Sequence, residues 1–240
     1  MNKIKAVFKS ISKIVFVKRC VACRELLPFD HEGDLCDKCA VEWDEAKRTV
    51  CPHCYDMQSR CRCGFGKKQV DSVRHLALYS HTERDTVANR LVYALKKSNR
   101  SDVFDFVARE MVNELIYKRR EKNTVVMSVP RNPESVRRYG YDHAKKLGKR
   151  VAELLDIGYI DALGHRGGKN EQKQLNKYQR EQNAKSNCFV KEKVILKIKG
   201  MHVILVDDIG TTGAMTGACA ELLKKNGALS VDCVLCAKNK

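Results

Sequence analysis

The sequence is poor in several features that would point directly to a function. Its 240 residues include 4 prolines, 1 tryptophan and only 7% aromatic residues. Proteins that bind single-stranded nucleic acid without sequence preference use aromatic stacking platforms, so this scarcity argues against strong binding of that kind. No apolar run is long enough to cross a bilayer, and lysines interrupt the N-terminal segment where a signal peptide needs a continuous apolar core. We therefore expect a cytoplasmic protein without a transmembrane segment.

Residues 1–19 form a basic segment with six basic residues and no acidic residue. Its apolar residues fall at helical spacing: Ile4, Val7, Phe8, Ile11, Ile14 and Val15. A basic amphipathic helix can lie on a membrane surface or on DNA, although packing on its own protein is more common. Peripheral contact with a membrane therefore stays open.

Acidic residues are also in short supply, with 29 Asp and Glu against 46 Lys and Arg and a formal net charge of +17. Such an excess favours polyanionic partners: nucleic acid, a pyrophosphate ligand or an acidic protein. A lysine-rich protein with none of these partners is the simpler alternative. The length suits one large domain, or one moderate domain with a small module.

Cysteine is abundant, and eight of the 12 cysteines lie in one segment. They form four close pairs: Cys20 and Cys23, Cys36 and Cys39, Cys51 and Cys54, and Cys61 and Cys63. Nothing in the sequence directs the chain to an oxidising compartment, so disulfides are not expected. Repeated pairs of this spacing are typical of tetrahedral zinc sites with a structural role. Two separate sets of four, interleaved pairs, and iron–sulfur ligation all remain open, and the last pair is the weakest assignment.

The other four cysteines are scattered through apolar patterns: Cys188, Cys219, Cys233 and Cys236. Cys219 falls in a helical pattern, and the last two fall in an apolar strand. We interpret all four as small core residues.

The stretch VILVDDIGTTGAMT, residues 203–216, predicts a strand, a tight loop and a helix. Residues 203–206 are continuously apolar, as in a parallel strand covered on both faces. Glycines, threonines and a helix N-terminus at the carboxyl end of such a strand favour a phosphate group. Asp207 and Asp208 suit the hydroxyls of a ribose on the same ligand. The alternative is an ordinary loop with acidic residues at the helix start.

Strand and helix patterns alternate from about residue 70 to the C-terminus. We expect an α/β fold, with a mostly parallel sheet flanked by helices, behind a small cysteine-rich module. The predicted boundaries are 1–19 for the basic segment, 20–66 for the cysteine-rich module and 67–240 for the α/β domain. The sequence GFGKK, residues 64–68, is the expected linker.

The stretch at residues 203–216 resembles the signature of the type I phosphoribosyltransferases: an apolar strand, two acidic residues, a linker, TTG and a further threonine. That resemblance implies a type I phosphoribosyltransferase-like sheet. It also implies that Asp207 and Asp208 face the ribose of phosphoribosyl pyrophosphate. The implied ligand-binding loop comprises Ile209, Gly210, Thr211, Thr212, Gly213, Ala214 and Thr216.

Cysteine pairs ahead of this signature are similar to the ComF family, the ComFC- and GntX-like proteins that carry a phosphoribosyltransferase domain behind a zinc finger. Three further segments agree in order: LVYALKKS at 91–98, VPRNPESVRRYGYDHA at 129–144 and QKQLNKYQREQNAKSNCF at 172–189. Lys97 replaces an aromatic residue of the family pattern, and Asp142 stands where asparagine is usual. The resemblance covers nearly the whole chain after Lys18.

The ComF resemblance implies further roles for basic residues. Pro130 and Arg131 would lie at the diphosphate, and Arg180, with Lys177, would lie on a mobile loop that closes over the site. Mg²⁺ would accompany phosphoribosyl pyrophosphate, and the zinc would be structural. The sequence offers no obvious general base; His143, His165 and Tyr178 are conceivable.

The resemblance also implies a role in DNA uptake and natural competence. Two functions follow. One is phosphoribosyl transfer to an unknown acceptor. The other is a non-catalytic competence factor that binds single-stranded DNA, or a helicase partner, and senses phosphoribosyl pyrophosphate. Whether the protein is an enzyme is left open by the sequence.

Overall fold

The computed structural model describes residues 18–51, 54–61, 63, 70–83, 85–115, 122–167 and 177–239. Most of the basic segment 1–19, the expected linker at 64–68 and the first part of the expected mobile loop lie outside these residues. Within the described residues, no helix combines the length and apolar character needed to cross a membrane.

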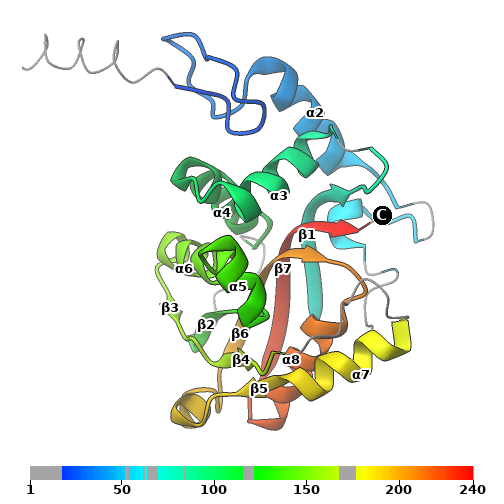
Figure 1. Ribbon diagram of the computed structural model, residues 1–240, viewed down its shortest axis with the longest axis vertical. Helices are drawn as coiled ribbons and strands as arrows, with labels where there is room; N and C mark the ends of the chain where they lie inside the picture. Colours follow the sequence, from blue (N-terminus) through cyan, green and yellow to red (C-terminus); the bar gives the residue numbers. More distant parts are fainter. Residues whose placement is uncertain are drawn as a thin grey trace, which may run out of the picture.

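Helices and strands alternate along the α/β part of the chain, as the sequence predicts (Figure 1). The first elements are α2 (Asp37–Arg48), the 3-10 helix η1 (Gln58–Arg60), β1 (Ser72–Tyr79), α3 (Val87–Lys97), α4 (Ser101–Leu115) and β2 (Thr124–Ser128). Next come α5 (Pro133–Tyr139), α6 (His143–Leu155), β3 (Gly158–Tyr159), β4 (Leu163–His165), α7 (Lys177–Asn187) and β5 (Cys188–Val190). The last are the 3-10 helix η2 (Glu192–Lys197), β6 (His202–Gly210), α8 (Ala214–Lys225) and β7 (Ser230–Asn239).

Five strands form one sheet in the order β1-β7-β6-β2-β3, and every neighbouring pair is parallel. The expected mostly parallel α/β fold is therefore confirmed. The short strands β4 and β5 form a separate antiparallel pair. Because parallel strands share a direction, the carboxyl ends of β1, β2, β6 and β7 lie along one edge of the sheet.

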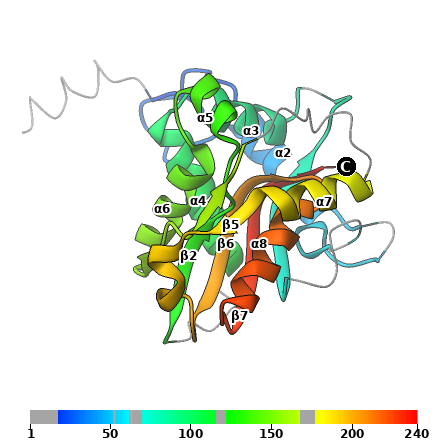
Figure 2. The same ribbon diagram turned by 60° about the horizontal axis from the view of Figure 1, so that its bottom comes forward.

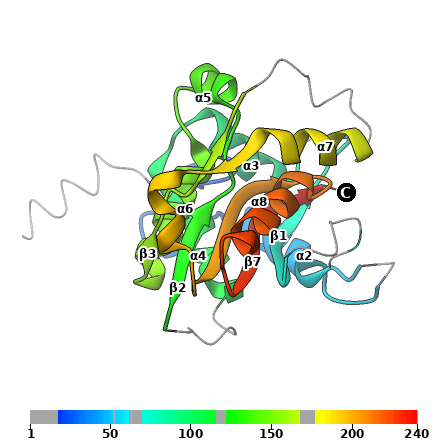
Figure 3. The ribbon, with the colours of Figure 1, turned by 90° about the horizontal axis from the view of Figure 1, so that it is seen from below.

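Apolar residues alternate between two cores because successive strand side chains point to opposite faces. Val126, Val206 and Val234 pack with α3, α4 and α6 on one face. Val125 and Leu205 pack with α8 on the other face, where α7 also lies against α8 (Figure 2). Figure 3 shows the sheet between these two helical layers. The sheet is thus covered on both sides, which explains why residues 203–206 of β6 are continuously apolar.

The cysteine-rich segment packs onto the first of these cores rather than standing apart. Trp43 of α2 is 2% exposed and its indole nitrogen donates to the Glu110 carboxylate of α4 at 2.7 Å. Its ring lies 5.9 Å from that of Phe106. The boundaries proposed for the module, 20–66, stay a prediction.

Three stretches differ from what the sequence pattern predicts. Residues 134–156 fit a single helical pattern, but Gly140 adopts φ +79° and ends α5, and Asp142 caps the start of α6. A residue in this left-handed conformation ends the regular hydrogen-bond ladder. The second half of the polar stretch expected as a mobile loop is the helix α7. The strand β6 also continues beyond residue 206 to Gly210, so both aspartates lie within it.

Candidate functional site

The loop between β6 and α8 has the geometry on which the phosphate-cradle prediction depends. It contains only three residues, 211–213, of which Thr211 is exposed. Gly213 has φ +70°, where a side chain would be strained, and it is the residue before the 12-residue helix α8. The free N–H groups and the dipole of that helix N-terminus favour an anion beside the loop.

The remaining members of the predicted loop lie around this turn. Ile209 and Gly210 end β6, and Ala214 begins α8, where its N–H lies 3.4 Å from the Thr212 hydroxyl oxygen. Thr216, one turn into α8, is only 3% exposed and contacts Cys233 of β7. Their contacts with a ligand stay a prediction.

The neighbouring aspartates of β6 have different surroundings. Asp208 accepts from Arg131 Nη1 through Oδ1 at 3.2 Å, and its Oδ2 lies 2.9 Å from His143 Nε2 and 3.3 Å from Lys96 Nζ. The Asp208 side chain is 4% exposed. We call these four residues the Asp208 cluster. The Asp207 carboxylate accepts the backbone N–H of residue 208 at 2.8 Å; the residue is partly exposed, but its carboxylate is buried on the side of Cys219 and Cys233.

This difference sets the two pKa values in opposite directions. Burial alone would raise the pKa of Asp208, but the charge of Lys96, the hydrogen bond with His143 and the charge of Arg131 hold it well below 3.8. Burial raises the pKa of Asp207 well above 3.8, and the negative charge of Asp208 raises it further. Asp208 is therefore ionised at neutral pH, while Asp207 takes up a proton more readily.

The side chains that surround Asp208 come from α3, from the segment after β2 and from the start of α6, and local hydrogen bonds hold these segments in place. The Tyr141 hydroxyl donates to the carbonyl of Leu95 at 2.5 Å and accepts from the N–H of Asn99 at 3.1 Å, which ties the end of α3 to the start of α6. Asp142 caps α6 by accepting from the N–H of Lys145 at 3.0 Å. The usual asparagine and this aspartate can make the same cap.

Two members of the cluster were not assigned to the site from the sequence. Lys96 carried no role, although it lies in the segment LVYALKKS that resembles the ComF pattern. His143 was considered only as a base, whereas it is 1% exposed and directed at Asp208. Spacing along the chain gave no signal for either contact, because 112 and 65 residues separate these side chains from Asp208 (208 − 96 and 208 − 143).

The expected diphosphate residues divide into two groups. Arg131 follows β2 and Pro130, and the structure brings it to Asp208. Arg180 lies on α7, the helix packed against α8, and is partly exposed. Its role at the site stays a prediction, as does that of Lys177.

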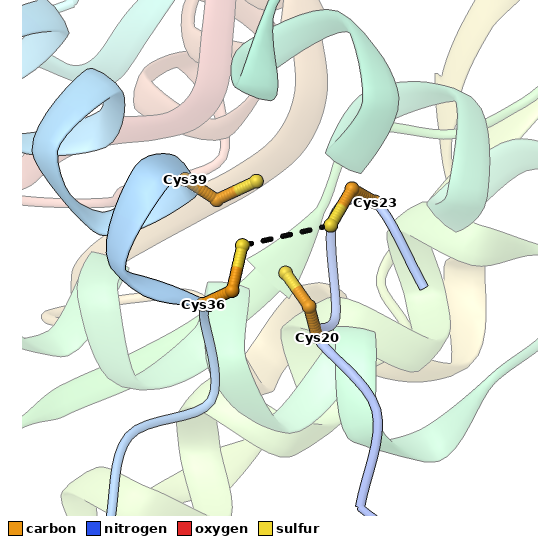
Figure 4. A group of neighbouring side chains, drawn as sticks. All are labelled: Cys20, Cys23, Cys36 and Cys39. Atoms are coloured by element: carbon orange, nitrogen blue, oxygen red, sulfur yellow. Dashed lines mark hydrogen bonds between the residues drawn. The ribbon is translucent and has the colours of Figure 1, made fainter. Parts of the chain in front are cut away.

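The first four cysteines form one cluster at the start of α2 (Figure 4). Their sulfur atoms all lie within 4.8 Å of one another, and those of Cys23 and Cys36 are 3.7 Å apart. Tetrahedral thiolates about 2.3 Å from a zinc ion are about 3.8 Å apart, so this spacing suits such an ion. Burial raises the pKa of Cys20, but backbone N–H groups, among them those of Cys23 and Cys36, outweigh it and lower it to about 7.

The second four cysteines form a similar cluster beside β1 and β7. The sulfur atoms of Cys51, Cys54, Cys61 and Cys63 lie within 4.8 Å of one another. Cys51 Sγ and Cys61 Sγ are 3.2 Å apart. Two sets of four, not interleaved pairs, are therefore brought together, and either set could hold a metal ion. The other four cysteines are buried core residues, as expected.

A cation of the α/β part reaches each cysteine cluster. Arg90 Nη2 of α3 donates to Cys39 Sγ at 3.6 Å and to Glu42 Oε2 at 3.2 Å. Lys238 Nζ of β7, in a residue only 6% exposed, donates to Cys61 Sγ at 3.4 Å. Within the described part of the chain, each cluster thus has one cationic partner for its four sulfur atoms.

Together these features define a class: a parallel α/β protein with an anion-favouring loop after a central strand and two four-cysteine clusters. The chain is 27% identical over 217 residues to the DNA utilization protein YhgH of Salmonella typhimurium, covering 88% of this chain and 93% of the relative. It is 24% identical over 214 residues to the competence protein ComFC of Streptococcus pneumoniae, covering 86% and 88%. These relatives support the similarity of the chain to the ComF family, so the resemblance seen in the sequence motifs is confirmed.

No family model matches the chain. Among solved structures, the allosteric regulatory enzyme of purine biosynthesis overlaps with a TM-score of 0.40 at 19% identity. The glutamine phosphoribosylpyrophosphate amidotransferase from B. subtilis gives 0.38 at 18%. Each overlap covers 60% of this chain and 30% of the other.

Proposed function

We propose that the loop after β6 binds phosphoribosyl pyrophosphate and that the protein acts in DNA uptake or utilisation. The observation that carries the ligand assignment is the junction of Gly213, in its left-handed conformation, with the N-terminus of α8. Backbone N–H groups there would hold the 5′-phosphate, while Asp207 accepts from ribose hydroxyls. The names of the relatives motivate the role in DNA utilisation and competence.

Transfer would follow from positioning and charge rather than from a protein nucleophile. The bond between ribose C1 and the diphosphate oxygen breaks with oxocarbenium character, and an acceptor adds to C1 as diphosphate leaves. Arg131, and Arg180 if α7 approaches the ligand, stabilise the negative charge that develops on the leaving group. The acceptor is not identified.

Mg²⁺ fits this arrangement as an ion carried by the ligand. Both Asp208 oxygens are engaged by Arg131, His143 and Lys96, so the phosphate and ribose oxygens are the natural ligands. When bound, the ion neutralises part of the diphosphate charge. No side chain is assigned to it.

Calorimetric titration with phosphoribosyl pyrophosphate and Mg²⁺ tests the ligand, and pyrophosphate release with a panel of bases tests transfer. We expect Asp207→Asn to weaken binding at least tenfold, about the value of one lost charged hydrogen bond. Asp161→Asn is the control, because that carboxylate pairs with Lys145 and Lys191. Equal affinity of Asp207→Asn and the unsubstituted protein would refute the ribose contact, and binding without release would favour a ligand sensor.

We further propose that each cysteine cluster holds one structural zinc ion. The cysteine pairs bring thiolate ligands without a histidine, and closed four-ligand sites of this kind are structural. Metal analysis of the purified protein should give two zinc ions per chain. Folded protein without metal would refute this assignment.

A second candidate function is the binding of single-stranded DNA by a basic face beside the Asp208 cluster. The contact of the Lys97 ammonium group with the Tyr139 ring, at 4.8 Å, holds the end of α3 beside α5, whose Arg137 and Arg138 are exposed. Tyr93 of α3 is 66% exposed. An exposed tyrosine beside exposed arginines suits a stacked base and its phosphates.

Binding to a labelled oligonucleotide at increasing salt tests this surface. The double variant Arg137→Ala with Arg138→Ala should weaken binding and reduce the salt dependence. Lys224→Ala with Lys225→Ala, at the end of α8, removes the same charge elsewhere. An equal loss in both double variants would mean that net charge alone attracts DNA.

A further inference from the structure

The Asp208 cluster places two fixed positive charges on one carboxylate. Arg131 engages Oδ1, while Lys96 and His143 approach Oδ2. The side chains of Lys96 and Arg131 are 28% and 20% exposed, whereas those of Asp208 and His143 are 4% and 1% exposed. The two cations therefore reach solvent, and the anion that balances them lies beneath.

Lys96 is also fixed in place by its helix. It lies in the last turn of α3, where the dipole of the helix favours a positive charge. The contacts of Tyr141 with Leu95 and Asn99 hold that turn on both sides of the lysine. A cation held in this way needs little rearrangement when an anion binds next to it.

We propose that Lys96 joins Arg131 in binding the diphosphate group, and that Asp208 is the internal counter-ion that holds these two cations in place. This inference rests on the proposed function and extends it, because it adds a ligand-binding residue to the site. The diphosphate competes with Asp208 for the two cations, and His143 keeps the carboxylate oriented beneath them.

The adjacent Lys97 gives a matched control. It has the same charge and follows Lys96 directly, but its ammonium group lies over the Tyr139 ring. The experiment compares Lys96→Met with Lys97→Met by calorimetry, using phosphoribosyl pyrophosphate with Mg²⁺, inorganic pyrophosphate and ribose 5-phosphate. Thermal unfolding of each variant shows whether it is folded.

For Lys96→Met we expect about 10–100-fold weaker binding of phosphoribosyl pyrophosphate and of inorganic pyrophosphate, the range for one charged hydrogen bond. Ribose 5-phosphate has no diphosphate, so the affinity of Lys96→Met for it should lie within about twofold of that of the unsubstituted protein. Lys97→Met should change none of the three. Lys96→Arg, which keeps the charge, should restore most of the loss.

Several outcomes overturn the proposal. An equal loss for all three ligands would mean that Lys96 only supports the local structure, and unchanged binding would remove it from the site; in both cases the proposed function stands. If the unsubstituted protein binds none of the ligands, the proposed function fails, and this inference fails with it. If Lys96→Met does not fold, Arg131→Gln must show the same selective loss of diphosphate ligands, and an unselective loss refutes the pair.

Discussion

The cysteine clusters and the Asp208 cluster have opposite charge balances. Among the described contacts, each cysteine cluster sets four sulfur atoms against one cation, Arg90 for the first and Lys238 for the second. The Asp208 cluster sets one ionised carboxylate against Lys96, Arg131 and a histidine. Charges in a partly buried site must be balanced by a partner. The first arrangement therefore fits a metal cation and the second an anionic ligand, although both are built on the same sheet.

The largest expected effect comes from removing one thiolate of the first cysteine cluster. Cys39→Ser should lose one of the two proposed zinc ions per chain and lower stability by several kcal/mol, because metal binding contributes directly to folding in such modules. Metal analysis and thermal unfolding measure both effects.

Cys236→Ala is the control for this substitution, because Cys236 is buried in β7 outside both clusters. It should keep the full metal content. If Cys39→Ser also kept it, the first cluster would not be a zinc site.

In the Asp208 cluster, Asp208→Asn removes the carboxylate that pairs with Lys96 and Arg131. Breaking a fully buried ion pair costs about 3–5 kcal/mol; because Lys96 and Arg131 are partly exposed, we expect about 2 kcal/mol here. Urea unfolding measures the loss. Asp207→Asn should cost much less, since Asp207 makes no ion pair with these side chains among the described contacts. Equal costs would mean that the two aspartates are not divided as the geometry indicates.

Acid should gradually reduce the contribution of the ionised Asp208 carboxylate to the free energy of unfolding. The pKa of Asp208 is held below 3.8 in the folded protein, so near that pH the unfolded chain binds more protons and the free energy of unfolding rises with pH. The contribution is complete above the unfolded pKa and is lost as the pH falls through the folded one. The stability difference between the unsubstituted protein and Asp208→Asn should therefore shrink as the pH falls from 6 towards 3. A difference independent of pH would contradict the ionised state of Asp208.

The smallest expected effect concerns the cation at the first cysteine cluster. Arg90→Gln removes the charged donor to Cys39 Sγ; because Arg90 is also held by Glu42 and Asp85, we expect a loss of metal affinity of about tenfold, the lower end of the usual range. A chelator competition assay should show faster loss of one zinc ion. Arg109→Gln, which removes a surface pair with Asp34, should leave the rate unchanged. If the unsubstituted protein, Arg90→Gln and Arg109→Gln all lost zinc at the same rate, Arg90 would have no effect on metal binding by the first cysteine cluster.

The sequence by itself determined the class of fold, the close cysteine pairs and the loop after β6. These features depend on local patterns: apolar runs that alternate with helical periods, close cysteine pairs, and glycine before a helix. The break at Gly140 was missed because residues 134–156 fit a single helical pattern, and only the backbone conformation of the glycine separates α5 from α6.

Only the tertiary structure decided which cysteine pairs belong together and how the two aspartates differ. Both depend on contacts between residues far apart in the chain. The segment after β2 and the start of α6 meet Asp208 because parallel strands bring their carboxyl ends to one edge, and the last turn of α3 packs there and adds Lys96. Adjacent residues in a strand also point to opposite faces, so Asp207 and Asp208 enter different surroundings although the sequence presents them as equivalents.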